Sequence, residues 1–121
     1  MESSIIPYIL PSQLLSHFSV TAVLELGDIK TKELYLEIHL EEDNELRSSL
    51  KASEYESKGF SSSSRIQDFP LRGKAVYLQI KRRRWRNKAT RKDLLNDYTF
   101  IAEGSKLTKE LSDFLKDTNR F

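Results

Sequence analysis

The chain has 121 residues, no cysteine, 38% hydrophobic and 31% charged residues, and a formal net charge of +2. This length and composition predict one soluble globular domain, too short for an enzyme with a deep cleft and unlike a disordered or membrane protein. The lack of cysteine excludes disulfides, thiol nucleophiles and thiolate zinc sites, and it favours a cytoplasmic location.

No targeting or membrane-spanning segment is expected. The first four residues lack the basic region of a signal peptide, and the apolar run at residues 5–10 is short and interrupted by Pro7. No run approaches the roughly 20 apolar residues that a helix needs to cross a bilayer. The sequence therefore predicts a protein that is not embedded in a membrane.

The small net charge hides two oppositely charged halves. Residues 1–64 carry 5 Lys and Arg against 11 Asp and Glu, a net charge of −6, whereas residues 65–121 carry 15 against 7, a net charge of +8. Within the second half, residues 65–92 hold 11 Lys and Arg and a single acid, Asp68. Such a local field favours a polyanion as partner, most commonly nucleic acid.

The first part of the chain predicts a short helix followed by a β-hairpin. Residues 11–18 place three apolar side chains on one helical face, behind a proline that the first turn tolerates. Apolar and polar residues then alternate at residues 18–26 and again at 33–40, the period of strands with one buried face. The two strands should pair as a hairpin. The residues expected to point inward are Val20, Ala22, Leu24, Leu26, Leu34, Leu36, Ile38 and Leu40.

The middle of the chain has weaker patterns. An acidic patch at residues 41–45 precedes residues 46–53, where two leucines four residues apart indicate one or two helical turns. Residues 57–64 are rich in Ser and Gly, which predicts a flexible loop. We interpret this loop as a seam within a single domain of residues 1–121, with a basic ribbon and a last helix in residues 65–121.

The basic half predicts a second hairpin. Residues 65–69 predict a short extended segment before a proline, and residues 71–73 predict a turn. A strand follows, in which residues 76–80 alternate apolar and polar side chains before the basic run begins. After a polar loop at residues 87–96, residues 97–102 are expected to return antiparallel to the basic strand.

A C-terminal helix completes the predicted fold. Ser105 is its expected N-cap, and residues 118–119 are its expected end. Leu107, Leu111, Phe114 and Leu115 form an apolar stripe that is wide enough to dock on a sheet. The predicted class is therefore α+β: a short N-terminal helix, an antiparallel hairpin, an irregular Ser-rich seam, a second basic hairpin and a C-terminal helix packed on the sheet.

Eight cationic side chains on and after the basic strand are the candidate nucleic-acid contacts. Guanidinium groups bind phosphate oxygens in pairs, and the release of counterions drives association. Like charges along one strand repel each other and favour an anionic partner, although a solvated strand end stays open as the alternative. We expect one outward-facing cationic ribbon. The candidates are Lys81, Arg82, Arg83, Arg84, Arg86, Lys88, Arg91 and Lys92.

The remaining candidate site residues are interpreted as structural. Trp85 and Tyr77 are predicted anchors, because a single tryptophan in a small domain is more often buried, although stacking on a base stays the alternative. His17 and His39 lack a paired nucleophile or carboxylate motif, and the acids of residues 41–45 lack the spacing of a calcium loop. The sequence thus predicts no catalytic residue, no metal site and no cofactor.

Four motifs in the second half carry a resemblance to a known family. They are "IQDFP" at residues 66–70, "RGKAVYL" at 72–78, "RRRWR" at 82–86 and "EGSKLTKEL" at 103–111. In this order and spacing they resemble the N-terminal region of bacterial insertion-sequence transposases of the Aon type, which are related to the larger ISL group. The resemblance covers residues 57–120, whereas the first half fits only by its general layout.

The resemblance also implies a difference at the predicted ribbon. In the larger group, the segment that resembles "RRRWR" leads into the Cys-x-x-Cys pair of a zinc ribbon. This chain has Asn-Lys-Ala-Thr at residues 87–90, and neither Asn nor Lys supplies a thiolate or an imidazole. The resemblance therefore implies a metal-free hairpin that keeps the shape of the ribbon and is stabilised by packing, with Trp85 and Tyr98 as fillers.

Charge and resemblance together predict that the chain recognises transposon-end DNA as the N-terminal region of a transposase. The resemblance implies that the metal-binding catalytic carboxylates belong to a separate domain, so no enzymatic activity is expected here, and a catalytic transposase subunit is a further partner. Two alternatives stay open. One is an RNA-binding or ribosome-associated module, and the other is an interaction protein whose acidic and basic halves bind neighbouring copies, which would give a homo-oligomer.

Overall fold

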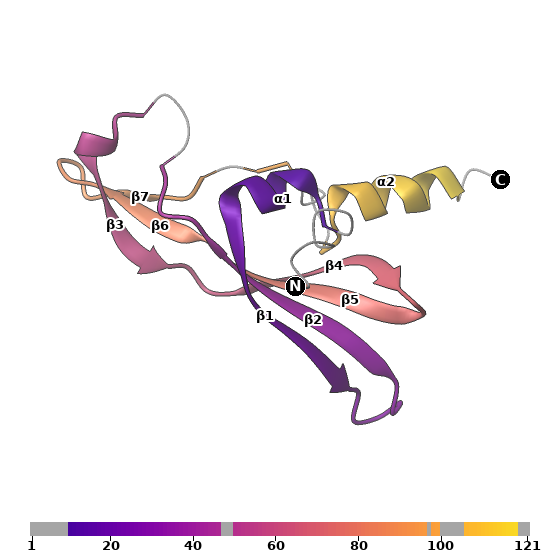
Figure 1. Cartoon of the computed structure of the whole chain (residues 1–121). Coiled ribbons are helices and arrows are strands. Elements are labelled where there is room, and N and C mark those ends of the chain that lie inside the picture. The colour runs from indigo at the N-terminus through magenta and orange to yellow at the C-terminus, as the bar shows by residue number, and fades with distance from the viewer. Residues whose placement is uncertain (1–9, 47–49, 97, 100–105, 119–121) are drawn as a thin grey trace.

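A computed structural model describes residues 10–46, 50–96, 98–99 and 106–118 (Figure 1). The strands form a four-stranded sheet A, in the order β1-β2-β5-β4, and a three-stranded sheet B, in the order β3-β6-β7. The predicted α+β class is confirmed, including the short first helix and the last helix packed on a sheet. The elements are α1 (Ser12–His17), β1 (Phe18–Gly27), β2 (Leu34–Glu42), the 3-10 turn η3 (Ala52–Glu54), β3 (Tyr55–Phe60), β4 (Ser64–Leu71), β5 (Lys74–Lys81), β6 (Arg83–Asn87), β7 (Asp93–Leu94) and α2 (Lys109–Thr118).

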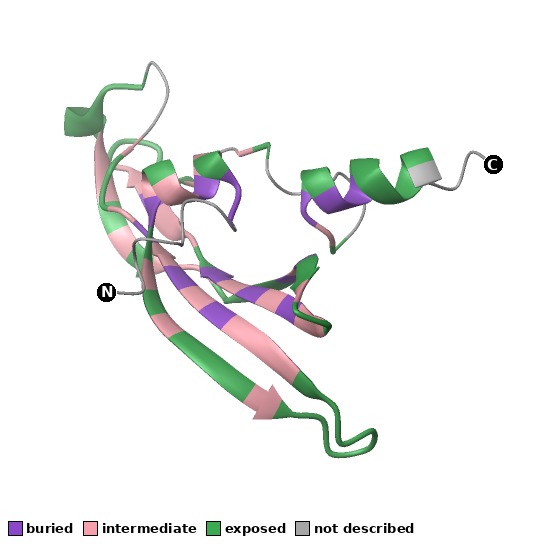
Figure 2. Cartoon of the chain, turned by 45° about the vertical axis from the view of Figure 1, so that its right-hand side comes forward, coloured by how far each residue is buried: buried purple, intermediate pink, exposed green. Residues whose placement is uncertain are grey.

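The first predicted hairpin is confirmed. Strands β1 and β2 pair antiparallel along their whole length. On β2, Ile38 and Leu40 are buried as expected, and Leu36 packs against the core from a half-buried position. Leu34, at the far end of the strand, is 49% exposed, because no helix reaches this end of the sheet (Figure 2).

A β-bulge at Thr21 reverses the two faces of β1. Before the bulge Val20 lies opposite Leu40, and after it Ala22 lies opposite His39. Because side chains alternate along a strand, one extra residue turns all later side chains to the other face. The prediction that Ala22, Leu24 and Leu26 point into the core is therefore wrong. They lie on the face of sheet A that is turned away from the helices.

Sheet A joins the two halves of the sequence. Strand β5 pairs antiparallel with β4 and parallel with β2, so that the first expected hairpin and a β4–β5 hairpin share one sheet. The second hairpin was instead expected between the basic strand and residues 97–102. The sequence analysis did not predict this parallel pairing. Helices α1 and α2 lie on one face of the sheet, and the opposite face is open (Figure 1). The buried core under the helices consists of Leu10, Leu14, Phe18, Ile38, Leu40, Ile66, Val76, Leu78 and Ile80.

Strands β3 and β4 run beside β6 and β5 as one long antiparallel ribbon that passes from sheet B into sheet A. The ribbon bends at residues 61–63, which separate β3 from β4, and at Arg82, which separates β5 from β6. At this bend the Ser61 N–H donates to the Arg82 carbonyl at 2.7 Å. The prediction of a flexible loop at residues 57–64 is wrong, because all but residues 61–63 belong to β3 or β4.

The segments around the basic strand differ from prediction in detail. The expected loop at residues 87–96 contains β7, which pairs antiparallel with β6. The expected return strand at residues 97–102 lies mostly outside the described residues, as does the predicted cap Ser105. Helix α2 instead begins after Thr108, whose hydroxyl accepts the Leu111 N–H at 3.3 Å. Of the helical turns expected at residues 46–53, the described part contains only the start of η3.

Two turns, at residues 28–33 and 87–92, are closed by the same hydrogen bonds. Asp28 Oδ1 accepts two backbone N–H groups, at 2.8 and 2.9 Å, and Asn87 Oδ1 accepts two at 2.9 Å. In each turn a threonine hydroxyl accepts the N–H two residues later, and the fifth residue, Lys32 or Arg91, has a φ of 64°. The shared pattern Asp/Asn-x-x-Thr-Lys/Arg identifies the turn in the sequence.

Glu42 ties the two sheets together where the ribbon bends. Its side chain is buried, with the residue only 2% exposed. Oε1 accepts the backbone N–H of Arg83 at 2.8 Å, and Oε2 accepts the side-chain amide of Asn96 at 2.7 Å and the hydroxyl of Tyr98. The Glu42 carbonyl in turn accepts a hydrogen bond from Arg83 Nε at 3.1 Å. A buried carboxylate is tolerated only with such a set of donors.

Replacing this carboxylate is expected to destabilise the fold. Glu42→Ala should lower the free energy of unfolding by about 3 kcal/mol, because it leaves buried donors on Arg83, Asn96 and Tyr98 without an acceptor. Urea unfolding followed by the fluorescence of Trp85 measures the change. The control is Glu41→Ala, a half-buried neighbour for which about 0.5 kcal/mol is expected. Similar losses in the two variants would contradict the junction role of Glu42.

The turn at residues 87–92 gives a second stability prediction. Asn87→Ala should lower the free energy of unfolding by about 1 kcal/mol, because two N–H groups lose their acceptor. Asn87→Asp keeps an acceptor oxygen and should lose clearly less, since Asp28 makes the same bonds in the other turn. Thermal unfolding of the three proteins under one buffer condition compares them. An aspartate variant as unstable as the alanine variant would show that the acceptor is not what closes the turn.

Candidate nucleic-acid interface

The structure divides the eight candidate cationic residues into two sets. Arg82, Arg83, Arg84 and Arg86 are half-buried and bonded within the chain. Lys81, Lys88, Arg91 and Lys92 are exposed. The eight residues therefore do not form one outward row of guanidinium groups. The first set builds the junction and sheet B, and the second set lies on their surface.

Arg82 and Arg83 belong to the junction. Arg82 donates through Nη2 to the carbonyl of Asn96, and its guanidinium lies 5.9 Å from the centre of the Tyr98 ring. Arg83 bonds the Glu42 carbonyl and lies 4.6 Å from the centre of the Phe60 ring. These contacts use both the charge and the flat face of each guanidinium. The two residues are held in place by the fold.

Arg84 and Arg86 share one carboxylate. Arg86 binds Asp93 through Nε at 2.6 Å and Nη2 at 3.2 Å, while Arg84 Nε lies 3.6 Å from the same side chain. The hydrogen bond from Arg86 holds the pKa of Asp93 below its ordinary value. The side chains of Arg84 and Arg86 remain 44% and 27% exposed. One carboxylate against two guanidinium groups leaves a positive charge that solvent and ligands can reach.

The exposed set is concentrated at the turn between β6 and β7. Lys88 donates to the carbonyl of Ser53 at 2.9 Å, and Arg91 lies 3.6 Å from Glu56 with 63% of its side chain exposed. Within the described part of the chain, the ammonium groups of Lys81 and Lys92 make no hydrogen bond or ion pair. These side chains are free to reorient toward a phosphate.

Sheet B keeps a strong positive field after this internal pairing. Residues 52–60 and 82–94 contain eight Lys and Arg against three acids, which leaves a net charge of +5. The three acids are Glu54, Glu56 and Asp93, and two of them already form ion pairs within sheet B. The field is therefore a property of this end of the molecule, and it remains although acids of the first half, such as Glu56, lie among these cations.

Tyr77 and Trp85 occupy different environments. Trp85 is 7% exposed within sheet B, and its Nε1 has no hydrogen-bond partner among the described residues. Tyr77 is half-buried on the open face of sheet A, where Arg65 lies 3.9 Å from its ring centre and Tyr35 meets it edge-on at 5.6 Å. Trp85 thus packs as an anchor would, whereas Tyr77 stands on an open surface.

The tyrosine pair borders a groove that the sequence analysis missed. The groove has a volume of about 650 Å³ and is lined by Tyr35, Tyr77, Arg65 and the β1–β2 and β4–β5 turns at one end of sheet A, including Arg72. Arg65 and Arg72 are exposed, and neither forms an ion pair in the described part of the chain. No local signal identifies this groove, because the parallel pairing of β2 with β5 brings its residues together.

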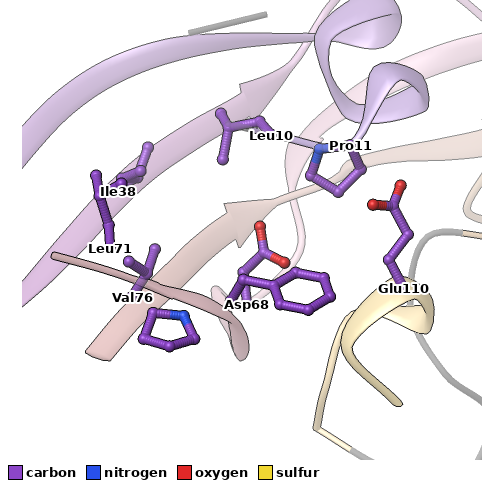
Figure 3. Close-up of a pocket in the computed structure, with 9 residues that line it drawn as sticks. Leu10, Pro11, Ile38, Asp68, Leu71, Val76 and Glu110 are labelled. Carbon is purple, nitrogen blue, oxygen red and sulfur yellow. The ribbon is translucent and has the colours of Figure 1, made fainter. Parts of the chain in front are cut away.

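A smaller apolar pocket of about 310 Å³ lies on the other face of sheet A, beside the starts of α1 and α2 (Figure 3). The Asp68 carboxylate lies in this pocket and accepts a hydrogen bond from the Thr108 hydroxyl at 2.9 Å. Asp68 is 3% exposed, and its burial raises the pKa of the carboxyl above the ordinary value. The bond to Thr108 fixes the first turn of α2 to β4.

The remaining polar candidates do not assemble into a catalytic centre among the described residues. His39 Nε2 lies 2.7 Å from a Glu37 oxygen on the open face, and His17 packs against the Tyr98 ring. No group of three or more metal-ligating side chains comes together in the part of the chain that the structure covers. Neither described helix has the length and hydropathy to cross a membrane.

Comparisons of the chain with protein-family models, with curated proteins and with solved structures found no match. The family resemblance therefore depends on the four sequence motifs alone.

The raised pKa of Asp68 gives a pH prediction. Because the folded-state pKa lies above the unfolded value of about 3.8, the contribution of this group is most favourable below that pH and is lost as pH rises through the folded pKa. Asp68→Asn keeps an acceptor for Thr108 but does not titrate. The difference in unfolding free energy, wild type minus variant, should therefore fall between pH 3 and pH 7 in urea titrations. A difference that is constant over this range would contradict the assignment.

Proposed function

We propose that the chain binds DNA as the N-terminal region of an insertion-sequence transposase and recognises transposon ends without carrying the catalytic site. The observation that supports this most is the net charge of +5 on sheet B, with the exposed cations Lys88, Arg91 and Lys92 on the turn between β6 and β7. The four-motif resemblance supplies the family. A catalytic domain or subunit with its own metal-binding carboxylates is the partner that the proposal requires.

Phosphate binding in the proposal uses both sets of cations. Lys81, Lys88, Arg91 and Lys92 neutralise phosphates directly, and the released counterions provide most of the affinity. Arg84 and Arg86 are already oriented by Asp93, so a phosphate that replaces this carboxylate meets a prepared guanidinium pair. Phosphate contacts set the register of the protein on DNA, and base contacts then add specificity.

The shape of sheet B favours DNA over RNA. The β6–β7 hairpin of this three-stranded sheet carries a cationic turn at residues 88–92, and β3 lies on the other side of β6. A two-stranded ribbon fits the major groove of B-form DNA, whereas the major groove of A-form RNA is too narrow for side chains to read. The proposal therefore places the β6–β7 turn at the major groove, between two phosphate backbones.

Neutralising the exposed turn should weaken DNA binding without unfolding the protein. The variant Lys88→Gln/Arg91→Gln/Lys92→Gln removes three charges and leaves the junction arginines intact. We expect affinity for duplex DNA to fall about tenfold or more at 0.1 M salt, and the slope of log K against log salt concentration to decrease by about 2 to 3. Fluorescence anisotropy with a labelled insertion-sequence terminal repeat measures both quantities.

The matched control removes three exposed charges elsewhere. Lys30→Gln/Lys106→Gln/Lys116→Gln has the same net charge as the test variant but leaves sheet B unchanged, so it should retain most of the affinity. In the opposite direction, Asp93→Asn frees Arg84 and Arg86 and should bind DNA more tightly than the wild type. Equal losses in the two triple variants would overturn the assignment of sheet B. Tighter binding to structured RNA than to terminal-repeat or random duplex DNA would overturn the DNA proposal.

A further inference from the structure

The two edges of sheet A are protected to different degrees. The outer edge of β4 contains Pro70 and is paired with the segment before α2, since Gln67 exchanges backbone hydrogen bonds with Lys106 and Thr108 at 2.8 and 2.9 Å. Proline and a covering segment are common ways of blocking a sheet edge. Strand β1 forms the other edge, and it has neither protection among the described residues.

The second half of β1 is apolar on both faces. Residues 22–27 read Ala-Val-Leu-Glu-Leu-Gly, with no Lys, Arg or Pro. Val23 is 55% exposed on the helix side, and Leu24 is 40% exposed on the open face. The strand extends beyond the helices, and no described segment lies along its outer side (Figures 1 and 2). An exposed, apolar edge of this kind is a template for another strand.

The backbone N–H and C=O groups of β1 point alternately toward β2 and outward. Asp28 N–H donates to the Glu33 carbonyl at 2.9 Å, so this pair is hydrogen-bonded toward β2. Antiparallel pairs alternate, which makes Leu26 and Leu24 the next residues bonded to β2. Glu25, between these two residues, and Val23, before Leu24, direct their N–H and C=O groups outward. A second strand can pair with β1 only in registers that place outward residues opposite outward residues.

Charge and the bulge select one of these registers for a second copy of the chain. Two copies that pair antiparallel are related by a two-fold axis, and each register is defined by the residue at this axis. An axis at Glu25 places two glutamates directly opposite each other. An axis at Val23 places Glu25 opposite the bulge at Thr21, and an axis at Leu26 places Leu24 opposite Asp28. An axis at Leu24 avoids all three, because it sets Val23 opposite the partner's Glu25 and Leu24 opposite the partner's Leu24.

The side chains of the β1 edge also favour a second copy of the chain as the partner strand. Glu25 is the sole charge in residues 22–27, and its carboxylate is already bonded to Lys74 at 2.5 Å. The edge therefore offers no charge that an oppositely charged foreign strand would recognise. It offers an apolar row that is complementary to itself. We propose that the β1 edges of two copies pair antiparallel about a two-fold axis at Leu24, which joins two copies of sheet A into one continuous sheet.

The register is tested by two substitutions of opposite charge at Val23. Val23→Glu places glutamates opposite each other on both sides of the axis, and it should raise the dimer dissociation constant about tenfold or more. Val23→Lys faces the partner's Glu25 and should leave dimerisation as strong as in the wild type or stronger. Sedimentation equilibrium measures the mass against the 14.1 kDa of one chain. Because Val23 is 55% exposed, neither change removes a core contact.

A disulfide test locates the axis independently of charge. The natural chain has no cysteine, so Leu24→Cys can only cross-link to another copy. The two residues at the axis form a pair whose Cα atoms are close enough for a disulfide, about 4.5 Å apart. Oxidation should therefore cross-link Leu24→Cys much faster than Ile29→Cys, a variant at an 87% exposed turn position. Leu26→Cys, which faces the partner's Ala22, should behave like Ile29→Cys.

The proposal has clear contrary outcomes. A wild-type chain that stays at 14.1 kDa up to millimolar concentration, or cross-linking of Leu24→Cys no faster than of Ile29→Cys, would overturn it. A dimer that Val23→Glu leaves intact would show that another surface or register is used. These measurements use no nucleic acid, so their result is separate from that of the DNA-binding experiment.

Discussion

The fold depends on one buried carboxylate at the point where its two sheets meet. Glu42 ends β2 in sheet A, and its oxygens bind the first residue of β6 and the side chains of Asn96 and Tyr98. The bend of the ribbon is also held by the bond from the Ser61 N–H to the Arg82 carbonyl and by the contacts of the Arg82 and Arg83 guanidinium groups. Those two arginines carry positive charge into the same region, so the negative charge of Glu42 also offsets their mutual repulsion. The direction in which sheet B leaves the molecule is therefore set by this contact.

This arrangement changes how the run of arginines at residues 82–86 is interpreted. In the sequence these residues look like one basic patch, but each guanidinium has a definite partner in the structure. Removing all of them together would test the stability of the junction as much as any binding. The field that remains at sheet B comes from the excess of cations over acids, and the side chains that can move toward a ligand lie on the β6–β7 turn. Anchored arginines and mobile cations thus have separate roles within one short segment.

The sequence was sufficient for local elements and insufficient for what joins them. Alternation at residues 18–26 and 33–40 predicted β1 and β2, and the apolar stripe at residues 107–115 predicted a C-terminal helix on the sheet. Of that stripe Leu111 is buried, whereas Phe114 and Leu115 stay 49% and 40% exposed. The bulge at Thr21 was not predicted, because a single inserted residue changes the face of every later side chain without changing the alternation itself. The parallel pairing of β2 with β5 escaped because its partners are about forty residues apart. The groove beside Tyr35 and Tyr77 depends on this pairing, so no local sequence pattern predicts it. In the sequence Glu42 is one acid of the patch at residues 41–45, and its burial was not predicted because it depends on the bend in a distant ribbon.

The two proposed surfaces lie at different ends of the molecule and use different physical forces. Sheet B projects from one end of sheet A, while the tip of the β1–β2 hairpin projects from another (Figure 1). Binding at sheet B is electrostatic and weakens as salt rises, because it releases counterions. Pairing at the β1 edge uses backbone hydrogen bonds and apolar contact, and it should change little with salt. Since no described residue of the β1 edge takes part in sheet B, pairing of two chains leaves both cationic turns accessible. A two-fold dimer would then present two such turns related by symmetry, and a DNA site read by both would be expected to have two-fold symmetry as well.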